Sequence, residues 1–111
     1  MKGRDVVYLK QIFEAISVVS GYIMGKNFSD FELDQMLQDA VVRKIEIIGE
    51  GARRMSDEFI EAHKELPLIA AISMRNRLIH EYEDIDLKVV WDTVSVDLPK
   101  LGGEIEKILA L

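Results

Sequence analysis

The chain has 111 residues, with 14 Lys and Arg against 20 Asp and Glu, so its formal net charge is −6 at pH 7. Its 49% hydrophobic residues and only 2 Pro exclude a disordered or low-complexity chain, and the length suits a single domain over residues 1–111. Because the chain has no cysteine, disulfides, thiolate metal sites and cysteine nucleophiles are excluded.

The charge and the hydropathy pattern also suggest where the protein acts. Net acidity argues against a protein that coats nucleic acid broadly, although it is compatible with a locally basic site. No uninterrupted apolar run approaches the roughly 20 residues needed to cross a bilayer, and the N-terminal sequence lacks a signal-peptide pattern. We therefore expect a cytoplasmic protein with no membrane contact.

Hydrophobic periodicity predicts two long helices in the first half of the chain. Apolar residues recur every three or four positions over residues 5–24, as in an amphipathic helix. A second helix is predicted to start at the capping-box sequence Ser29-Asp30-Phe31-Glu32 and to run unbroken to about residue 63. In its middle, Gly49 and Gly51 would either kink the helix or allow a neighbouring helix to approach closely.

The second half of the chain also reads as helical. Pro67 suits the first turn of a third helix over residues 68–80, and because that helix is apolar around much of its circumference we expect it to be central. Asp84 or Asp86 is placed to cap a fourth helix, which Pro99 must kink or end. Since no segment shows the two-residue alternation of a strand, we predict an all-α antiparallel bundle of four or five helices.

Polar residues gather at the end of the third predicted helix. In chain order they are Arg75, Asn76, Arg77, His80 and Tyr82. The stretch from residue 66 to residue 80 contains no acidic residue, and its two arginines give it a charge of +2, so the rest of a chain of net charge −6 carries −8. This stretch is the candidate for a locally basic site.

The chemistry of these residue types suits RNA cleavage without a metal or cofactor. Arginine presents a planar fork of donors that fits a phosphate, and histidine titrates near neutrality and accepts a proton from a sugar hydroxyl. In this interpretation His80 activates the 2′-hydroxyl, and Arg75 stabilises charge on the phosphate. The alternative is a structural one, because Arg and His at a helix end also bond the last carbonyls and complement the dipole.

The spacing of these residues constrains how they meet. Asn76 and His80 are four positions apart and share a helix face, whereas Arg75 and His80 are separated by about 140° around an ideal helix. Arg75 and His80 therefore converge only if the helix unwinds near His80 or if a second subunit supplies one of them.

A second arginine-containing segment, Gly49-Glu50-Gly51-Ala52-Arg53-Arg54, superficially suggests a phosphate loop. It has no preceding strand and no Gly-Lys-Ser/Thr, and it lies within a helical pattern. We therefore interpret Glu46, Glu50, Arg53 and Arg54, at spacings of three and four, as a salt-linked helix face.

The sequence Arg-Asn-Arg-Leu-Ile-His-Glu-Tyr at residues 75–82 matches an Arg-x4-His-x-Tyr signature and resembles the HepT-like toxins of the HEPN superfamily. The resemblance extends to residues 5–16, 45–52 and 86–101, and thus along nearly the whole chain. One departure is Pro67-Leu68-Ile69, where family members often have Pro-Trp entering the third helix.

This resemblance implies an all-helical homodimer whose two motifs face each other across a cleft. It implies a ribonuclease toxin acting on RNA, neutralised by a cognate antitoxin that is a minimal nucleotidyltransferase. By the resemblance, Arg75 and His80 are catalytic, Asn76 and Arg77 are supporting polar residues, and Tyr82 accepts AMP from the antitoxin. AMP on Tyr82 would place phosphates beside the catalytic pair and reverse the charge of the RNA site.

Two other functions stay open at this point. The chain could be a non-catalytic helical dimer that binds nucleotide and regulates a partner nucleotidyltransferase, since the acidic run over residues 81–86 would repel a polyanion. It could also be a purely structural bundle, which would bind neither RNA nor nucleotide.

Overall fold

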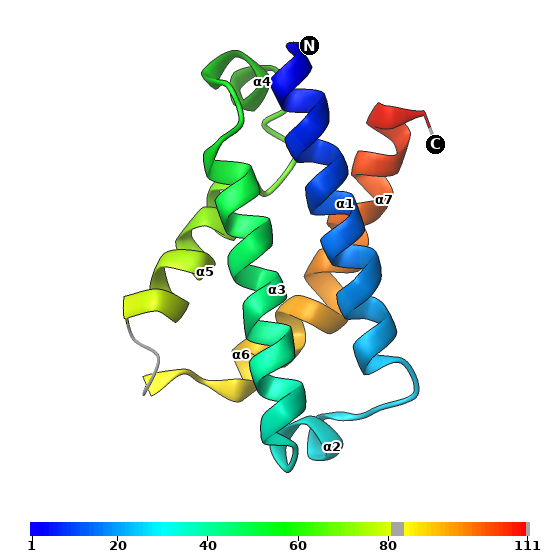
Figure 1. Cartoon of the computed structure of the whole chain (residues 1–111), viewed down its shortest axis with the longest axis vertical. Coiled ribbons are helices and arrows are strands. Elements are labelled where there is room, and N and C mark those ends of the chain that lie inside the picture. Colours follow the sequence, from blue (N-terminus) through cyan, green and yellow to red (C-terminus); the bar gives the residue numbers. More distant parts are fainter. Residues whose placement is uncertain (81–83, 111) are drawn as a thin grey trace.

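The computed structural model describes residues 1–80 and 84–110, and within them the chain is all-α (Figure 1). Its long helices run antiparallel, with α1 and α3 side by side, α5 outside α3, and the C-terminal helices returning along α1. The elements in order are α1 (Gly3–Ile23), α2 (Phe28–Glu32), α3 (Gln35–Arg53), α4 (Asp57–Ala62), α5 (Leu68–His80), α6 (Leu87–Asp92), the π-helix η2 (Thr93–Asp97) and α7 (Leu98–Leu109). The predicted all-α antiparallel bundle is confirmed.

The expected unbroken helix over residues 29–63 is wrong, because this stretch forms α2, α3 and α4. Two side chains restart the helix by N-capping: Asp34 accepts a hydrogen bond from a backbone N–H of α3 at 3.0 Å, and Ser56 does the same for α4 at 3.1 Å. The capping box also lies two residues earlier than predicted, between Asn27 and Asp30. Apolar periodicity continues across both breaks, so it did not reveal them.

Gly49 and Gly51 do not kink α3, which is continuous through both residues. They allow neighbouring helices to pack closely against it. A Cβ on Gly49 would collide with the side chain of Arg75 on α5 and would lie 2.8 Å from the carbonyl oxygen of Ala71. A Cβ on Gly51 would lie 2.9 Å from Ile12 Cγ1 on α1. The two glycines therefore let α5 and α1 approach α3 on either side of Glu50.

The core lies where α1, α3 and the C-terminal helices meet. Its most deeply buried residues include Leu9, Ile12, Val19, Val41, Ile48, Val94 and Ile105. Contrary to the sequence-based expectation, α1 is long and apolar enough to cross a membrane by length and composition, with a mean hydropathy of 1.3 over 18 residues. Its buried residues pack against α3 and α7, as those of a core helix do.

The expectation that the third predicted helix is central is also wrong. Although α5 has the predicted bounds, it packs almost entirely on α3 and lies at the edge of the chain (Figure 1). Only Leu68 and Leu78 are buried, whereas Ile69 is 70% exposed and Ile79 is 44% exposed. The helix has apolar residues on two sides, and a single chain covers only the side that faces α3.

The C-terminal elements follow the predicted signals. Of the two candidate caps, Asp86 caps α6 by accepting a hydrogen bond from Lys88 N at 2.9 Å. Pro99 lies in the first turn of α7, where its missing N–H breaks no helical hydrogen bond, and the π-helical turn η2 precedes it.

Candidate functional site

The predicted site residues line two hollows on different sides of α5. The first, which we call the arginine hollow, has a volume of about 460 Å³ and lies among α1, α3 and α5. Its lining residues are Tyr8, Gln11, Arg43, Glu46, Ile47, Glu50, Gly51, Arg54 and Arg75. The second, which we call the histidine face, is a shallow, open hollow of about 470 Å³ on α5. It is lined by Ile69, Ile72, Ser73, Asn76, Arg77 and His80.

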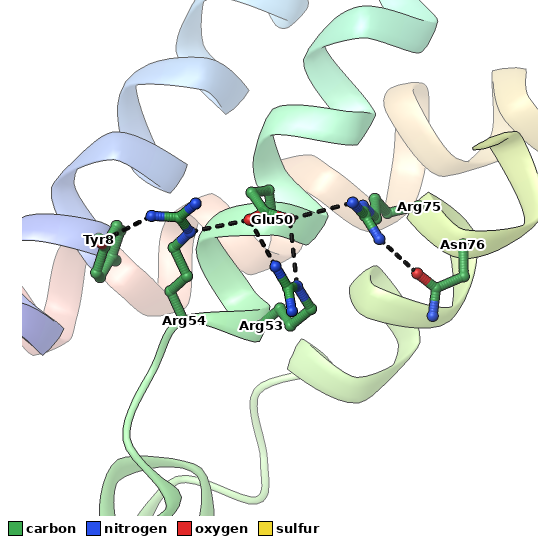
Figure 2. Close-up of polar contacts among 6 residues, drawn as sticks. All are labelled: Tyr8, Glu50, Arg53, Arg54, Arg75 and Asn76. Carbon is green, nitrogen blue, oxygen red and sulfur yellow. Dashed lines mark hydrogen bonds and ion pairs between the residues drawn. The ribbon is translucent and has the colours of Figure 1, made fainter.

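Glu50 is the centre of the arginine hollow (Figure 2). Its carboxylate accepts hydrogen bonds from Arg53 Nη2 and Arg54 Nε, both at 2.9 Å, and lies 3.3 Å from Arg75 Nη2. The hydrogen bond from Arg53, and then the one from Arg54, lowers the pKa of Glu50 to about 2. The carboxylate therefore stays ionised at neutral pH and acts as a counter-ion for three guanidinium groups.

Of the salt-linked face predicted on α3, the pairs of Glu50 with Arg53 and Arg54 are confirmed, whereas Glu46 pairs with Arg43, and the structure extends the network to a second helix. Besides the pairs around Glu50, Arg43 Nη1 lies 3.8 Å from Glu46 Oε2 one turn earlier. The link to Arg75 was not predicted, because Arg75 follows Glu50 by 25 positions and no helical spacing joins them. One signal in the sequence could have indicated this contact. Glu50 has a glycine on each side, and a glycine in a helix allows another helix to approach closely.

Arg75 lies between the two hollows. Its side chain is 25% exposed, with Nη2 facing Glu50 and Nη1 donating a hydrogen bond to Asn76 Oδ1 at 2.9 Å (Figure 2). Asn76 was expected to be a supporting polar residue, and its described contact is with Arg75. Since Asn76 also lines the histidine face, it connects that face to the arginine network.

Tyr8 brings α1 into the same network and was not singled out from the sequence. Its hydroxyl accepts a hydrogen bond from Arg54 Nη1 at 3.4 Å, and the guanidinium carbon lies 5.9 Å from the ring centroid. This is within the range of a cation–π contact. Figure 2 shows the resulting row of side chains, which runs from Tyr8 through Glu50 to Asn76 and thus crosses three helices.

His80 does not reach the arginine hollow. Because α5 stays α-helical to His80, local unwinding does not bring His80 and Arg75 together within one chain. Arg77 lines the histidine face, and it also lines a third, small hollow with Asp84 and Asp86. The described acidic residues after α5 therefore line a different hollow from Arg75.

Two further predictions concern Tyr82 and a metal ion. Tyr82 lies outside the described residues. Within residues 1–80 and 84–110, no three His, Cys, Asp or Glu side chains gather closely enough to hold a metal ion.

Comparisons with known proteins agree with the family resemblance of the sequence. The family described as ribonuclease HepT-like matches residues 12–108. A "Probable ribonuclease HepT" from Thermococcus cleftensis is 39% identical over 97% of this chain and 98% of its own length. A "Putative RNase" from Caldanaerobacter subterraneus subsp. tengcongensis is 34% identical over 92% of this chain and 91% of its own length.

A third relative is a longer protein than this chain. In Methanocaldococcus jannaschii, a "Gamma-glutamylcyclotransferase and putative RNase" is 41% identical over 96% of this chain, which spans 48% of that longer protein. No solved structure gives a significant match to the chain.

Proposed function

The chain belongs to the ribonuclease HepT-like family, and on that premise we propose that it is a metal-independent endoribonuclease, active as a homodimer and serving as the toxin of a toxin–antitoxin pair in the cytoplasm. The observation that carries this proposal is the split of the motif. Arg75 lines one hollow and His80 another, with Asn76 between them. Such a site is incomplete in a single chain.

A second copy of the chain is the proposed source of the missing half. The histidine face belongs to α5 alone, and it combines the exposed apolar Ile69 with Asn76, Arg77 and His80. A two-fold axis beside this face would pack it on its own copy, since isologous contacts use the same patch twice. In that dimer His80 of one copy would approach Arg75 of the other.

The chemistry then proceeds on one phosphodiester. His80 accepts the proton of the 2′-hydroxyl, the 2′-oxygen attacks the adjacent phosphorus, and the bond to the 5′-oxygen breaks. Arg75 stabilises the negative charge that builds up on the phosphoryl oxygens. The leaving 5′-oxygen takes a proton from an acid such as the second histidine or water. The products are a 2′,3′-cyclic phosphate and a 5′-hydroxyl.

The antitoxin is proposed to act through Tyr82. The phenol oxygen of Tyr82 would attack the α-phosphorus of ATP on a minimal nucleotidyltransferase, with loss of the phenol proton and release of pyrophosphate. The transferred AMP would bring a negative charge next to the positive charges that bind RNA. Coexpression with the cognate nucleotidyltransferase should add AMP-sized mass increments to wild-type protein and none to Tyr82→Phe; an increment on both proteins would exclude Tyr82 as the acceptor.

The direct test of the ribonuclease proposal is cleavage of RNA in EDTA by purified protein. We expect His80→Ala to lower the rate about 10²- to 10⁴-fold and Arg75→Ala about 10²- to 10³-fold, with Arg75→Lys in between because it keeps the charge but loses the fork. Products should carry cyclic phosphate ends. Equal cleavage by wild-type protein and both alanine variants would reject the assignment.

The regulatory alternative makes a different prediction. A non-catalytic dimer would bind nucleotide and alter the activity of its partner nucleotidyltransferase without cleaving RNA under any condition. The position of Asp84 and Asp86, away from the arginine hollow, removes part of the repulsion that motivated this alternative.

A further inference from the structure

The arginine hollow concentrates positive charge in an acidic protein. Of the six arginines in a chain of net charge −6, three line this hollow, Arg43, Arg54 and Arg75, and Arg53 is joined to it through its ion pair with Glu50. The two carboxylates among them are Glu46 and Glu50. Only Arg75 belongs to the Arg-x4-His-x-Tyr motif, so the motif does not account for the other three.

These arginines are accessible and keep donors for a ligand. The side chains of Arg53 and Arg54 are each 54% exposed, and that of Arg43 is 69% exposed. A guanidinium has five N–H donors, and the described contacts of Arg54 use its Nε and one Nη while leaving the other Nη to face solvent or a ligand. Glu50 therefore holds Arg53 and Arg54 in place, and the described contacts of Arg54 do not use all of its donors.

The position of Arg75 determines what this hollow would receive. Arg75 forms a wall of the arginine hollow and, through Asn76, borders the histidine face. If the reacting phosphate of an RNA strand lies at Arg75, the rest of the strand extends to both sides of α5. On the side that faces α3, the strand enters the arginine hollow.

We propose that the arginine hollow is a second phosphate subsite, which binds a backbone phosphate of the RNA next to the one that is cleaved. Arg43 and Arg54 bind this phosphate, and when the subsite is empty Glu46 serves as the counter-ion of Arg43 and Glu50 as that of Arg54. Bidentate guanidinium contacts suit a phosphodiester, and single-stranded RNA is commonly held by such backbone-following basic grooves. The inference rests on the proposed ribonuclease function.

The test separates binding from cleavage by using an RNA that cannot react. A fluorescent 2′-O-methyl oligonucleotide of 12 nucleotides lacks the 2′-hydroxyl nucleophile, and its affinity is measured by anisotropy over a range of salt concentrations. We expect Arg54→Gln and Arg43→Gln to weaken binding, by about tenfold for Arg54→Gln, and each to reduce the slope of log K against log salt by about 0.7. The matched control is Lys26→Gln, an exposed positive charge in the turn after α1, which should change neither quantity.

The outcomes distinguish the subsite from the function on which it rests. Binding by Arg54→Gln and Arg43→Gln that equals wild type, with the same salt slope, overturns the subsite and leaves the ribonuclease proposal standing. An equal loss of affinity in all three variants, Lys26→Gln included, also overturns the subsite. The loss would then come from the lower positive charge of the whole protein and not from the position of the arginines. If wild-type protein binds no oligonucleotide and cleaves no RNA, the function itself is wrong.

A second measurement uses substrate length. A dinucleotide offers only the reacting phosphate, whereas a tetranucleotide also offers neighbouring ones. Arg54→Gln should therefore raise KM for the tetranucleotide by a larger factor than it raises KM for the dinucleotide. An equal effect on both substrates would mean that Arg54 acts on Arg75 or on folding, and would overturn the subsite. Thermal melting of each variant checks that it is folded.

Discussion

Glu50 shows how a single carboxylate organises residues from several helices. It holds Arg53 and Arg54 on its own helix and Arg75 on α5, and Arg54 in turn contacts Tyr8 on α1. Without this counter-ion the three guanidinium groups would repel one another. Glu50 therefore contributes both to the stability of the bundle and to the placement of the proposed catalytic Arg75.

The lowered pKa of Glu50 predicts an acid-sensitive contribution to stability. Because the pKa is about 2 in the folded chain against an ordinary value of 4.5, folding is favoured above pH 4.5, and this contribution is lost as the pH falls toward 2. Glu50→Gln should thus melt below wild type at pH 7, and the difference in Tm should shrink steadily below pH 4.5.

The pH experiment needs a control variant, and a second carboxylate, Asp5, also makes the stability sensitive to acid. Glu61, whose partner is the exposed Lys64, provides the matched variant Glu61→Gln, which should leave Tm nearly unchanged at every pH. Asp5 keeps some acid sensitivity in all three proteins, because burial raises its pKa but the hydrogen bonds from Ser56, with smaller contributions from Lys2 and Arg4, together lower the pKa further. A Tm difference between wild type and Glu50→Gln that is independent of pH would contradict the ion-pair account.

At the scale of single residues, the sequence predicted part of the arginine network. The Arg-x4-His spacing gave Arg75 and His80 as candidates, which stays a prediction, and helical spacing correctly predicted the pairs of Glu50 with Arg53 and Arg54. The contact between Glu50 and Arg75 was not predictable from spacing, because it depends on how two helices pack.

At the scale of the elements, the packing of α3 is the feature that places the site. A glycine on each side of Glu50 allows α5 and α1 to approach the same turn of α3, so Arg75 and Tyr8 flank one carboxylate. Helix bounds were predictable where strong signals exist, as at Pro67 before α5 and Asp86 before α6. The breaks on either side of α3 were missed because apolar residues continue with the same period.

The close approach at Gly49 predicts a sharp steric effect. Gly49→Ala places a methyl group against Arg75 and the carbonyl of Ala71, so we expect a loss of about 1–3 kcal/mol in the free energy of unfolding, measured with urea. RNA cleavage should fall together with the stability, because the added methyl group displaces the side chain of Arg75.

Gly103 in α7 supplies the opposite control, because a Cβ there would meet nothing within 4 Å. Gly103→Ala should stabilise the protein by up to about 1 kcal/mol, as alanine favours a helix more than glycine does. If Gly49→Ala also stabilises the protein, α5 does not pack as tightly on α3 as the structure indicates.

At the scale of the whole molecule, the position of α5 is the most informative departure from the sequence-based expectation. A helix that is apolar around much of its circumference was expected in the centre, yet it lies at the edge of the chain with Ile69 70% exposed. The pattern of residues predicted correctly that this helix is apolar around much of its circumference. It could not show that one chain covers only the side that faces α3; the proposed homodimer would cover the other side.

This interpretation predicts that a charge on the exposed side of α5 separates the dimer. Ile69→Lys should cost the folded single chain little, because the side chain is already exposed, but it should convert the dimer to monomer and abolish RNA cleavage. Light scattering after size-exclusion chromatography measures the mass.

Leu33→Lys is the matched control, since Leu33 is 86% exposed after α2 and away from α5. It should leave the dimer intact. A dimeric Ile69→Lys protein would place the interface elsewhere.

The central claim is that one active site takes Arg75 and His80 from two copies of the chain. The most direct measurement is RNA cleavage by a heterodimer of Arg75→Ala and His80→Ala chains, purified through two different tags. One of its two sites would keep both residues, so the heterodimer should cleave at about half the wild-type rate, while each variant homodimer is inactive. A heterodimer as inactive as the variant homodimers, beside an active wild type, would contradict the claim and place both residues of each site in one chain.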